Sequence, residues 1–240
     1  TYTAIYADSG HGKTTSMIMF AGNLIMNGYN VYWSDHEGAK KHVIQPLYEY
    51  VQEKLPVPEY IQDVMKRFYI TDDTYDIVDI KRTARMLNSN GNLDAVFVDY
   101  IQNVDNGIYT QDTDIVKNTS KELNKLKSEL DCVVVVGSQV TLKGADRRSG
   151  WALFPSDNDW RDSGQIKQDA DYILSVFRPS KIEGLLEQDE QTGQVYSKDS
   201  NGNRIHKNSV FMRPVKVRGV HKFKQEHLVH NYYGLDFNVG

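Results

Sequence analysis

Cysteine is almost absent from this 240-residue sequence, which contains only Cys132. A single thiol excludes an internal disulfide framework and a cysteine-rich metal site. Cys132 lies in the apolar run of residues 132–136, so we expect a small buried hydrophobic side chain there and not a reactive thiol.

Long hydrophobic runs are also missing. The longest apolar stretch, residues 17–26, is interrupted by Asn23 and is shorter than the roughly 20 residues that a membrane-spanning helix requires. Residues 1–6 lack the basic segment and apolar core of a secretory signal. We therefore expect no membrane association and a cytoplasmic location, which would be the host cytoplasm for a viral chain.

Positive charge is not in excess, because the formal net charge is −4. Any contact with nucleic acid would therefore depend on local basic clusters. Hydrophobic residues make up 40% of the sequence and charged residues 25%, which is typical of a globular protein. The length fits a single α/β domain over residues 1–240.

Strands and helices are predicted to alternate along most of the chain. This alternation predicts a mostly parallel β-sheet flanked by helices. The strands are expected at residues 2–6, 31–34, 68–70, 95–99, 133–137 and 172–177, and the helices at residues 13–26, 77–87 and 115–130.

Three segments are less regular. Pro46 interrupts a helical pattern, so we expect that helix to begin only at Pro46 and to be closed by Pro56 and Pro58. Residues 141–159 are polar and are predicted to form a long mobile loop. The pair Asn201-Gly202 predicts a turn that leads to a strand near Ser209, within a set of C-terminal antiparallel hairpins.

The clearest motif is the segment Ala7-Asp-Ser-Gly-His-Gly-Lys-Thr-Thr15, which lies between a predicted strand and a predicted helix. This arrangement is typical of a phosphate-binding loop, with ATP and Mg²⁺ as the expected cofactors. Lys13 would reach the β- and γ-phosphates, and the Thr14 hydroxyl would bind the metal. Ala7 replaces the usual first glycine, so the backbone there must suit alanine. The candidate nucleotide-binding residues are Ser9, Gly10, His11, Gly12, Lys13, Thr14 and Thr15.

Polar side chains follow the predicted strands. Asp99 closes one strand and is the second candidate metal ligand. Glu37 is the candidate catalytic base, with Asp35 as its rival, and helix capping is the alternative role for both. Gln139 is a candidate γ-phosphate sensor, and a plain polar strand end is equally compatible with its position.

Together these motifs resemble the C-terminal RecA-like ATPase domain of bacterial or phage DnaB-type replicative helicases. The Arg161 to Asp171 stretch is the most family-specific part. The resemblance rests on the phosphate loop and on Ser34-Asp-His-Glu37, Val98-Asp-Tyr-Ile-Gln102, Gly137-Ser-Gln139, Trp160-Arg-Asp-Ser-Gly-Gln-Ile-Lys-Gln-Asp-Ala-Asp171 and Val215-Lys-Val-Arg218.

The resemblance implies a RecA-like P-loop core that hydrolyses ATP while moving along single-stranded DNA, with 5′–3′ polarity. It implies a homo-oligomer, a hexameric ring, with primase and a helicase loader as further partners. Glu37 would be the base, Asp99 a Mg²⁺ ligand and Gln139 the sensor. Lys216 and Arg218 would reach a neighbouring subunit's nucleotide. The DNA-contacting residues would be Lys143, Arg147 and Arg148.

The chain departs from that pattern in two ways. It begins almost at the first strand, so we expect the N-terminal helicase domain and linker to be absent. The acidic segment 183–190 and the following hairpin have no counterpart in the family pattern. Two alternatives stay open at this point: a recombinase or loader ATPase that forms filaments, and an assembly ATPase that does not bind DNA.

Overall fold

The computed structural model describes residues 1–38, 40–55, 57–73, 76–91, 93–104, 112–140, 148–156, 159, 164–219, 228–231 and 236–239. Within them lies a nine-stranded sheet in the order β12-β11-β10-β6-β1-β5-β4-β2-β3. Its strands are β1 (Tyr2–Ala7), β2 (Val31–Asp35), β3 (Phe68–Thr71), β4 (Ala95–Asp99), β5 (Val133–Gln139), β6 (Tyr172–Phe177), β10 (Ser209–Val217), β11 (Leu228–Asn231) and β12 (Asp236–Val239).

The strands β1 to β6 are parallel, and β10, β11 and β12 are antiparallel additions beside β6. This confirms the mostly parallel sheet and the C-terminal antiparallel strands. Because all six parallel strands point the same way, their carboxyl ends form one edge, where ligands of such sheets usually bind.

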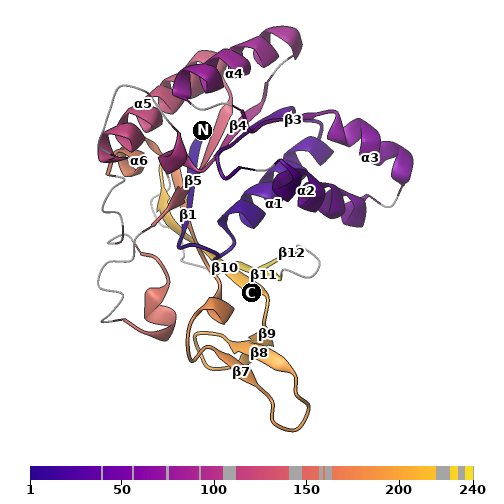
Figure 1. The fold of residues 1–240 in the computed structure, drawn as a ribbon, viewed down its shortest axis with the longest axis vertical. Coiled ribbons are helices and arrows are strands. Elements are labelled where there is room, and N and C mark those ends of the chain that lie inside the picture. The colour runs from indigo at the N-terminus through magenta and orange to yellow at the C-terminus, as the bar shows by residue number, and fades with distance from the viewer. Residues whose placement is uncertain are drawn as a thin grey trace.

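Helices cover both faces of the sheet (Figure 1). Residues of α1, α2 and α3 pack with Ile5, Trp33 and Phe97 on one face. Residues of α4 and α5 pack with Tyr32 and Val96 on the other. The helices are α1 (Lys13–Met26), α2 (Lys41–Lys54), α3 (Pro58–Met65), α4 (Ile77–Gly91), α5 (Asp112–Leu130) and α6 (Gly164–Asp169). Among the described helices, none combines the length and apolarity needed to cross a bilayer.

The helix α2 does not begin where the sequence predicts. It begins at Lys41 and contains Pro46 in its interior. The proline removes one backbone hydrogen bond. However, α2 buries a stripe that includes Val43 and Leu47 against α1, and this packing favours a helix that starts before the proline. The helix α3 was not predicted; Pro58 stands at its first position, where proline is tolerated, and so begins a helix where we expected an end.

A second, three-stranded sheet projects from the main body (Figure 1). It consists of β7 (Leu186–Gln188), β8 (Val195–Lys198) and β9 (Arg204–His206). The turn at Asn201-Gly202 is confirmed, with Gly202 at φ 83°. Its predicted partner was wrong, because the turn joins β8 to β9, whereas the strand that begins at Ser209 pairs with β6 of the main sheet.

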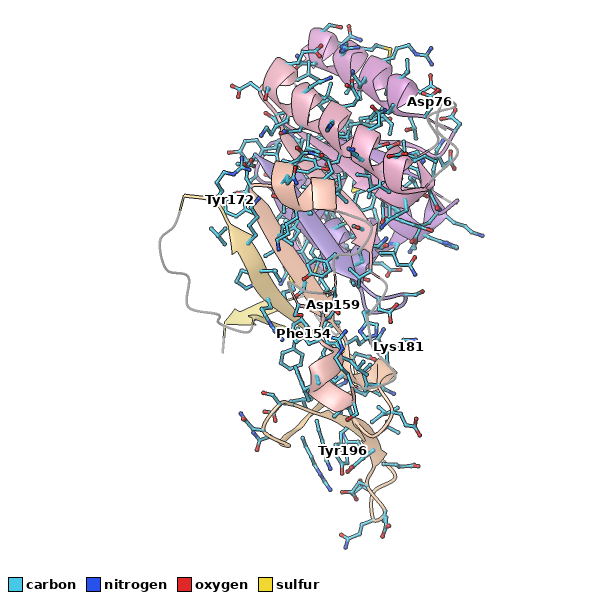
Figure 2. The ribbon with its side chains drawn as sticks, turned by 90° about the vertical axis from the view of Figure 1, so that its left-hand side faces the viewer. Asp76, Phe154, Asp159, Tyr172, Lys181 and Tyr196 are labelled. Atoms are coloured by element: carbon cyan, nitrogen blue, oxygen red, sulfur yellow. The ribbon has the colours of Figure 1, made fainter. Side chains whose placement is uncertain are left out.

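The predicted loop 141–159 is wrong in part. Residues 141–147 lie outside the described chain, but Gly150–Leu153 form a 3₁₀ turn, η3. Its Trp151 packs with Phe154, Phe177 and Phe211 at the base of the second sheet. Figure 2 shows Phe154 and Lys181 at this junction, between the main body and the sheet that carries Tyr196. Burial of these aromatic side chains explains why residues 150–153 form a regular turn although the sequence around them is polar.

Candidate nucleotide-binding site

The phosphate loop has the backbone that its glycines predict. Gly10 (φ 74°) and Gly12 (φ 96°) adopt left-handed conformations that other residues rarely tolerate, and Gly12 is the N-cap of α1. Ala7 is the last residue of β1 and is paired in register with Gln139. Because strand backbone suits alanine, the glycine of the usual pattern is not required there.

A cavity of about 250 Å³ lies over this loop at the carboxyl edge of the sheet. The helix N-terminus and the backbone N–H groups around Gly12 suit an anionic ligand. The cavity is lined by Ala7, Asp8, Ser9, Gly10, Gly12, Lys13, Thr14, Thr15, Glu37, Gln139 and Arg178.

Lys13, Thr14 and Asp99 form a compact group beneath the cavity. The Lys13 ammonium lies 2.6 Å from Asp99 Oδ1, and the Thr14 hydroxyl donates a hydrogen bond to Asp99 Oδ2 at 2.6 Å. Only 1% of the Asp99 side chain is exposed, so the lysine compensates a buried carboxylate. A hydroxyl and a carboxylate held together are oxygen donors of the kind that Mg²⁺ prefers, and they fit the predicted metal site.

Gly137 makes this group possible. A Cβ atom at this position would lie 2.7 Å from Asp99 Oδ1 and 3.1 Å from Lys13 Cδ. Any other residue at position 137 would therefore force either the ion pair or the backbone of β5 to shift. The glycine of the Gly137-Ser-Gln139 motif is required by close packing, since its φ is not in the left-handed region.

The structure separates the two candidate bases. Glu37 lines the cavity, its side chain is 48% exposed, and its Oε1 lies 3.3 Å from the Lys13 ammonium. Asp35 is 4% exposed, is not among the lining residues, and accepts the Glu37 backbone N–H at 3.1 Å. The geometry therefore favours Glu37 as the residue that faces a ligand and gives Asp35 the task of shaping the turn.

His11 differs from the other loop residues that we expected at the nucleotide. The residue is 4% exposed and is not among those that line the cavity. Instead, Nδ1 accepts the Arg178 backbone N–H at 3.0 Å, and the ring packs on Phe177. Burial lowers the pKa of His11. The imidazole thus fastens the phosphate loop to the end of β6.

Two residues at the site were missed from the sequence. Arg178 lines the cavity from the end of β6, and nothing in its local sequence distinguishes it from a surface arginine. Gln102 lies in η1 (Ile101–Asn103), directly after β4, and contacts Ser138 and Gln139. It belongs to a motif quoted above, but its contact with a distant strand end cannot be read from spacing.

Lys216 and Arg218 lie away from this cavity. The strand β10 runs antiparallel to β6 and carries them toward the opposite edge of the sheet. Lys216 donates hydrogen bonds to the carbonyls of Lys167 and Ala170, and Arg218 forms an ion pair with Asp171 at 2.9 Å. They therefore cannot serve the nucleotide of their own chain without leaving these contacts.

Of the three basic residues expected at DNA, only Arg148 falls within the described part of the chain; Lys143 and Arg147 lie outside it. The Arg148 guanidinium binds both carboxylate oxygens of Asp159, at 2.5 and 3.2 Å. The Asp159 side chain is 2% exposed, so Arg148 neutralises a buried charge. This structural contact was not foreseen and makes Arg148 less available to phosphate than a solvated arginine.

Comparisons with known proteins agree with one another. The family model of the DnaB-like helicase C-terminal domain matches residues 3–216. A probable plasmid replicative DNA helicase of Chlamydia psittaci is 30% identical over an alignment of 196 residues that covers 74% of this chain and 42% of that protein. The replicative DNA helicase DnaB of Mycobacterium intracellulare is 30% identical over 136 residues, 56% of this chain and 23% of that protein. The chain thus spans less than half the length of these relatives.

Solved structures show the same fold. One of them, a separately solved ATPase domain, superposes with a TM-score of 0.74 at 20% identity, covering 98% of this chain and 83% of that one. A DnaB-like replicative helicase, whose title also describes its interactions with primase, gives a TM-score of 0.75 at 20% identity and covers 99% and 57%. The chain therefore has the fold of a helicase ATPase domain.

Proposed function

Since this chain belongs to the family of DnaB-like helicase C-terminal domains, we propose that it is the ATP-hydrolysing motor of a replicative DNA helicase that moves along single-stranded DNA. The observation that carries this proposal is the grouping of Lys13, Thr14, Asp99 and Glu37 around one cavity. These residues come from three separate segments of the sequence and meet at the edge where nucleotides bind in such sheets.

Each residue then has a defined task. Backbone N–H groups of the loop and the Lys13 ammonium bind the phosphates, and Thr14 and Asp99 hold Mg²⁺. When bound, the metal offsets the negative charge that the phosphates carry. Glu37 orients the attacking water and accepts its proton, and Gln139 contacts the γ-phosphate from the end of β5. Lys13 leaves Asp99 for the phosphates when nucleotide enters.

We further propose that Lys216 and Arg218 act on the nucleotide of a neighbouring subunit in a hexameric ring. Their position at the sheet edge opposite the phosphate loop supports this proposal. The phosphate loop of one subunit could then face Lys216 and Arg218 of its neighbour. An arginine supplied in trans raises the rate of phosphoryl transfer by roughly 10³ to 10⁵.

The variant Arg218→Ala tests this assignment. Turnover should fall by roughly 10³ or more while nucleotide binding stays within about twofold. Arg204→Ala is the matched control, because that arginine lies in β9 of the second sheet and pairs with Asp189, the residue after β7. Unchanged turnover of Arg218→Ala at concentrations where the protein is assembled would show that the cation acts elsewhere.

The proposed partners are single-stranded DNA, primase and a helicase loader, and the proposed place of action is the cytoplasm. Lys143 and Arg147, with Arg148 if it leaves Asp159, would contact DNA phosphates without base specificity. The test is ATP hydrolysis with and without single-stranded DNA across protein concentrations, with Lys13→Ala as the background. Stimulation that grows with assembly is expected. Intact hydrolysis without stimulation or DNA binding would point to an assembly ATPase, and filaments in electron micrographs would point to a recombinase.

A further inference from the structure

The short turn η1 joins three strand ends that carry the chemistry of the site. It follows β4 directly, so it is covalently attached to Asp99 through Tyr100. Its amide side chains reach in two directions, Gln102 toward the end of β5 and Asn103 toward the end of β2. We propose that Gln102 and Asn103 are positioning residues, which hold Gln139 and the Glu37 turn at fixed places on either side of Asp99.

Gln102 acts on Gln139 through the backbone. Its Oε1 accepts the Gln139 N–H at 3.2 Å, and its Nε2 donates to the Gln139 carbonyl at 2.8 Å. The register of β4 with β5 ends at Val98 and Val136, before Gln139 is reached. A primary amide carries the same donor and acceptor as a peptide group. The Gln102 side chain therefore extends the β4–β5 ladder to the residue that faces the γ-phosphate.

A third hydrogen bond also joins the Gln102 side chain to β5. Gln102 Nε2 also lies 3.0 Å from the hydroxyl oxygen of Ser138, which is fully buried. Two successive residues of β5 are therefore held by one side chain. Because one amide makes all of these bonds, a shift of the end of β5 would have to break them together or move η1 with it.

Asn103 plays the corresponding part for Glu37. Its Nδ2 donates to the His36 carbonyl at 3.0 Å, while the His36 N–H donates to the Asp99 carbonyl at 2.7 Å. The residue before Glu37 is thus tied to both β4 and η1. Glu37, Asp99 and Gln139 consequently behave as one unit, and a displacement of η1 would move the base and the sensor relative to the phosphates.

The kinetic arm of the test rests on the proposed ATP hydrolysis. In Gln102→Ala, kcat should fall about tenfold while nucleotide affinity stays within about twofold, because the amide touches the sensor and not the ligand. Asn103 is solvent-exposed, so Asn103→Ala should lower kcat by only about threefold. Gln45→Ala is the matched control, since that amide donates to Glu49 on the outer side of α2 and should leave both constants unchanged.

A second readout does not require activity. Hydrogen exchange of the Gln139 amide should be faster by at least about tenfold in Gln102→Ala than in the parent or in Gln45→Ala. Gln102→Glu keeps the acceptor but loses the donor, so the Gln139 amide should stay protected while kcat still falls. If the parent chain hydrolyses no ATP, the proposed function fails. The exchange result would still show whether Gln102 holds the backbone of Gln139.

Three results would overturn the inference. Gln102→Ala could show the parent's kcat, or it could leave exchange at Gln139 unchanged. It could also lose nucleotide affinity and melting temperature in step with kcat, which would indicate a general loss of structure. In the same way, unchanged kcat in Asn103→Ala would remove Asn103 from the proposal.

Discussion

Replacing Gly137 by alanine adds one methyl group at the most crowded point of the site. The new carbon would lie 2.7 Å from Asp99 Oδ1, 3.0 Å from Met17 Sδ and 3.1 Å from Lys13 Cδ. The carboxylate cannot yield easily, because Lys13 and Thr14 both hold it at 2.6 Å. We therefore expect the backbone of β5 to shift or the ion pair to loosen.

The expected loss of stability follows from overpacking of a buried site. An added methyl group in a close-packed core costs roughly 1–3 kcal/mol. For a domain of this length, each kcal/mol lowers Tm by roughly 2–4 °C, so a decrease of about 4–8 °C is expected for the middle of that range. Displacement of the metal ligand by a few tenths of an ångström should also lower kcat by at least about tenfold.

Thermal unfolding and ATP hydrolysis measure both effects. Gly91→Ala is the matched control, because that glycine ends α4 and a Cβ there would meet no atom within 4 Å. It should keep its activity and gain up to about 1 kcal/mol of stability from helix propensity. If Gly137→Ala melted and hydrolysed ATP like the parent, the close approach of Gly137 to Asp99 would not constrain the site.

Three further predictions concern packing and charge. Gly22→Ala would bring a Cβ to 2.5 Å from the Tyr50 ring, so the contact between α1 and α2 should open. Calorimetry should then show a Tm lowered by several degrees, and an unchanged Tm would contradict this packing. Lys13→Ala should abolish nucleotide binding in titrations and also lower Tm, because the buried Asp99 loses its cation; a parental Tm would show that the pair adds no stability. Burial raises the pKa of Cys132 to about 11, so iodoacetamide at pH 8 should label the native chain far more slowly than the unfolded one. Because the folded state disfavours the thiolate, Cys132 should not affect the free energy of unfolding below pH 9 and should reduce it between pH 9 and 11. Fast labelling of the native chain would refute the burial of Cys132.

The sequence predicts the parts of the fold that depend on local patterns. The helix at Lys13–Met26 and the strands Ala95–Asp99 and Tyr172–Phe177 have the predicted bounds, since each is a largely apolar segment next to polar residues. The errors at α2 and α3 have a different origin. Proline destabilises a helix interior locally, but packing against another helix can offset this loss. Such packing cannot be predicted from the sequence of one segment.

The same division applies to the site. The grouping of Lys13, Thr14 and Asp99 could be predicted, because a phosphate loop and a strand-end carboxylate are local signals; their roles at a nucleotide stay a prediction. The inward placement of His11 and the place of Arg178 at the cavity depend on the contact between the loop and β6. That contact joins residues far apart in sequence, and a single sequence contains no record of it.

The strands β6 and β10 have a consequence for how this chain tolerates change in length. Phe177, the last residue of β6, lies opposite Phe211 in β10. The chain leaves the main sheet after Phe177, forms β7, β8 and β9, and returns to the main sheet next to Phe177 (Figure 1). Residues added or removed at the outer tip, between Gln188 and Val195, would leave the strand register of the main sheet intact. That tip is accordingly a natural place to graft an affinity tag or a fluorescent reporter.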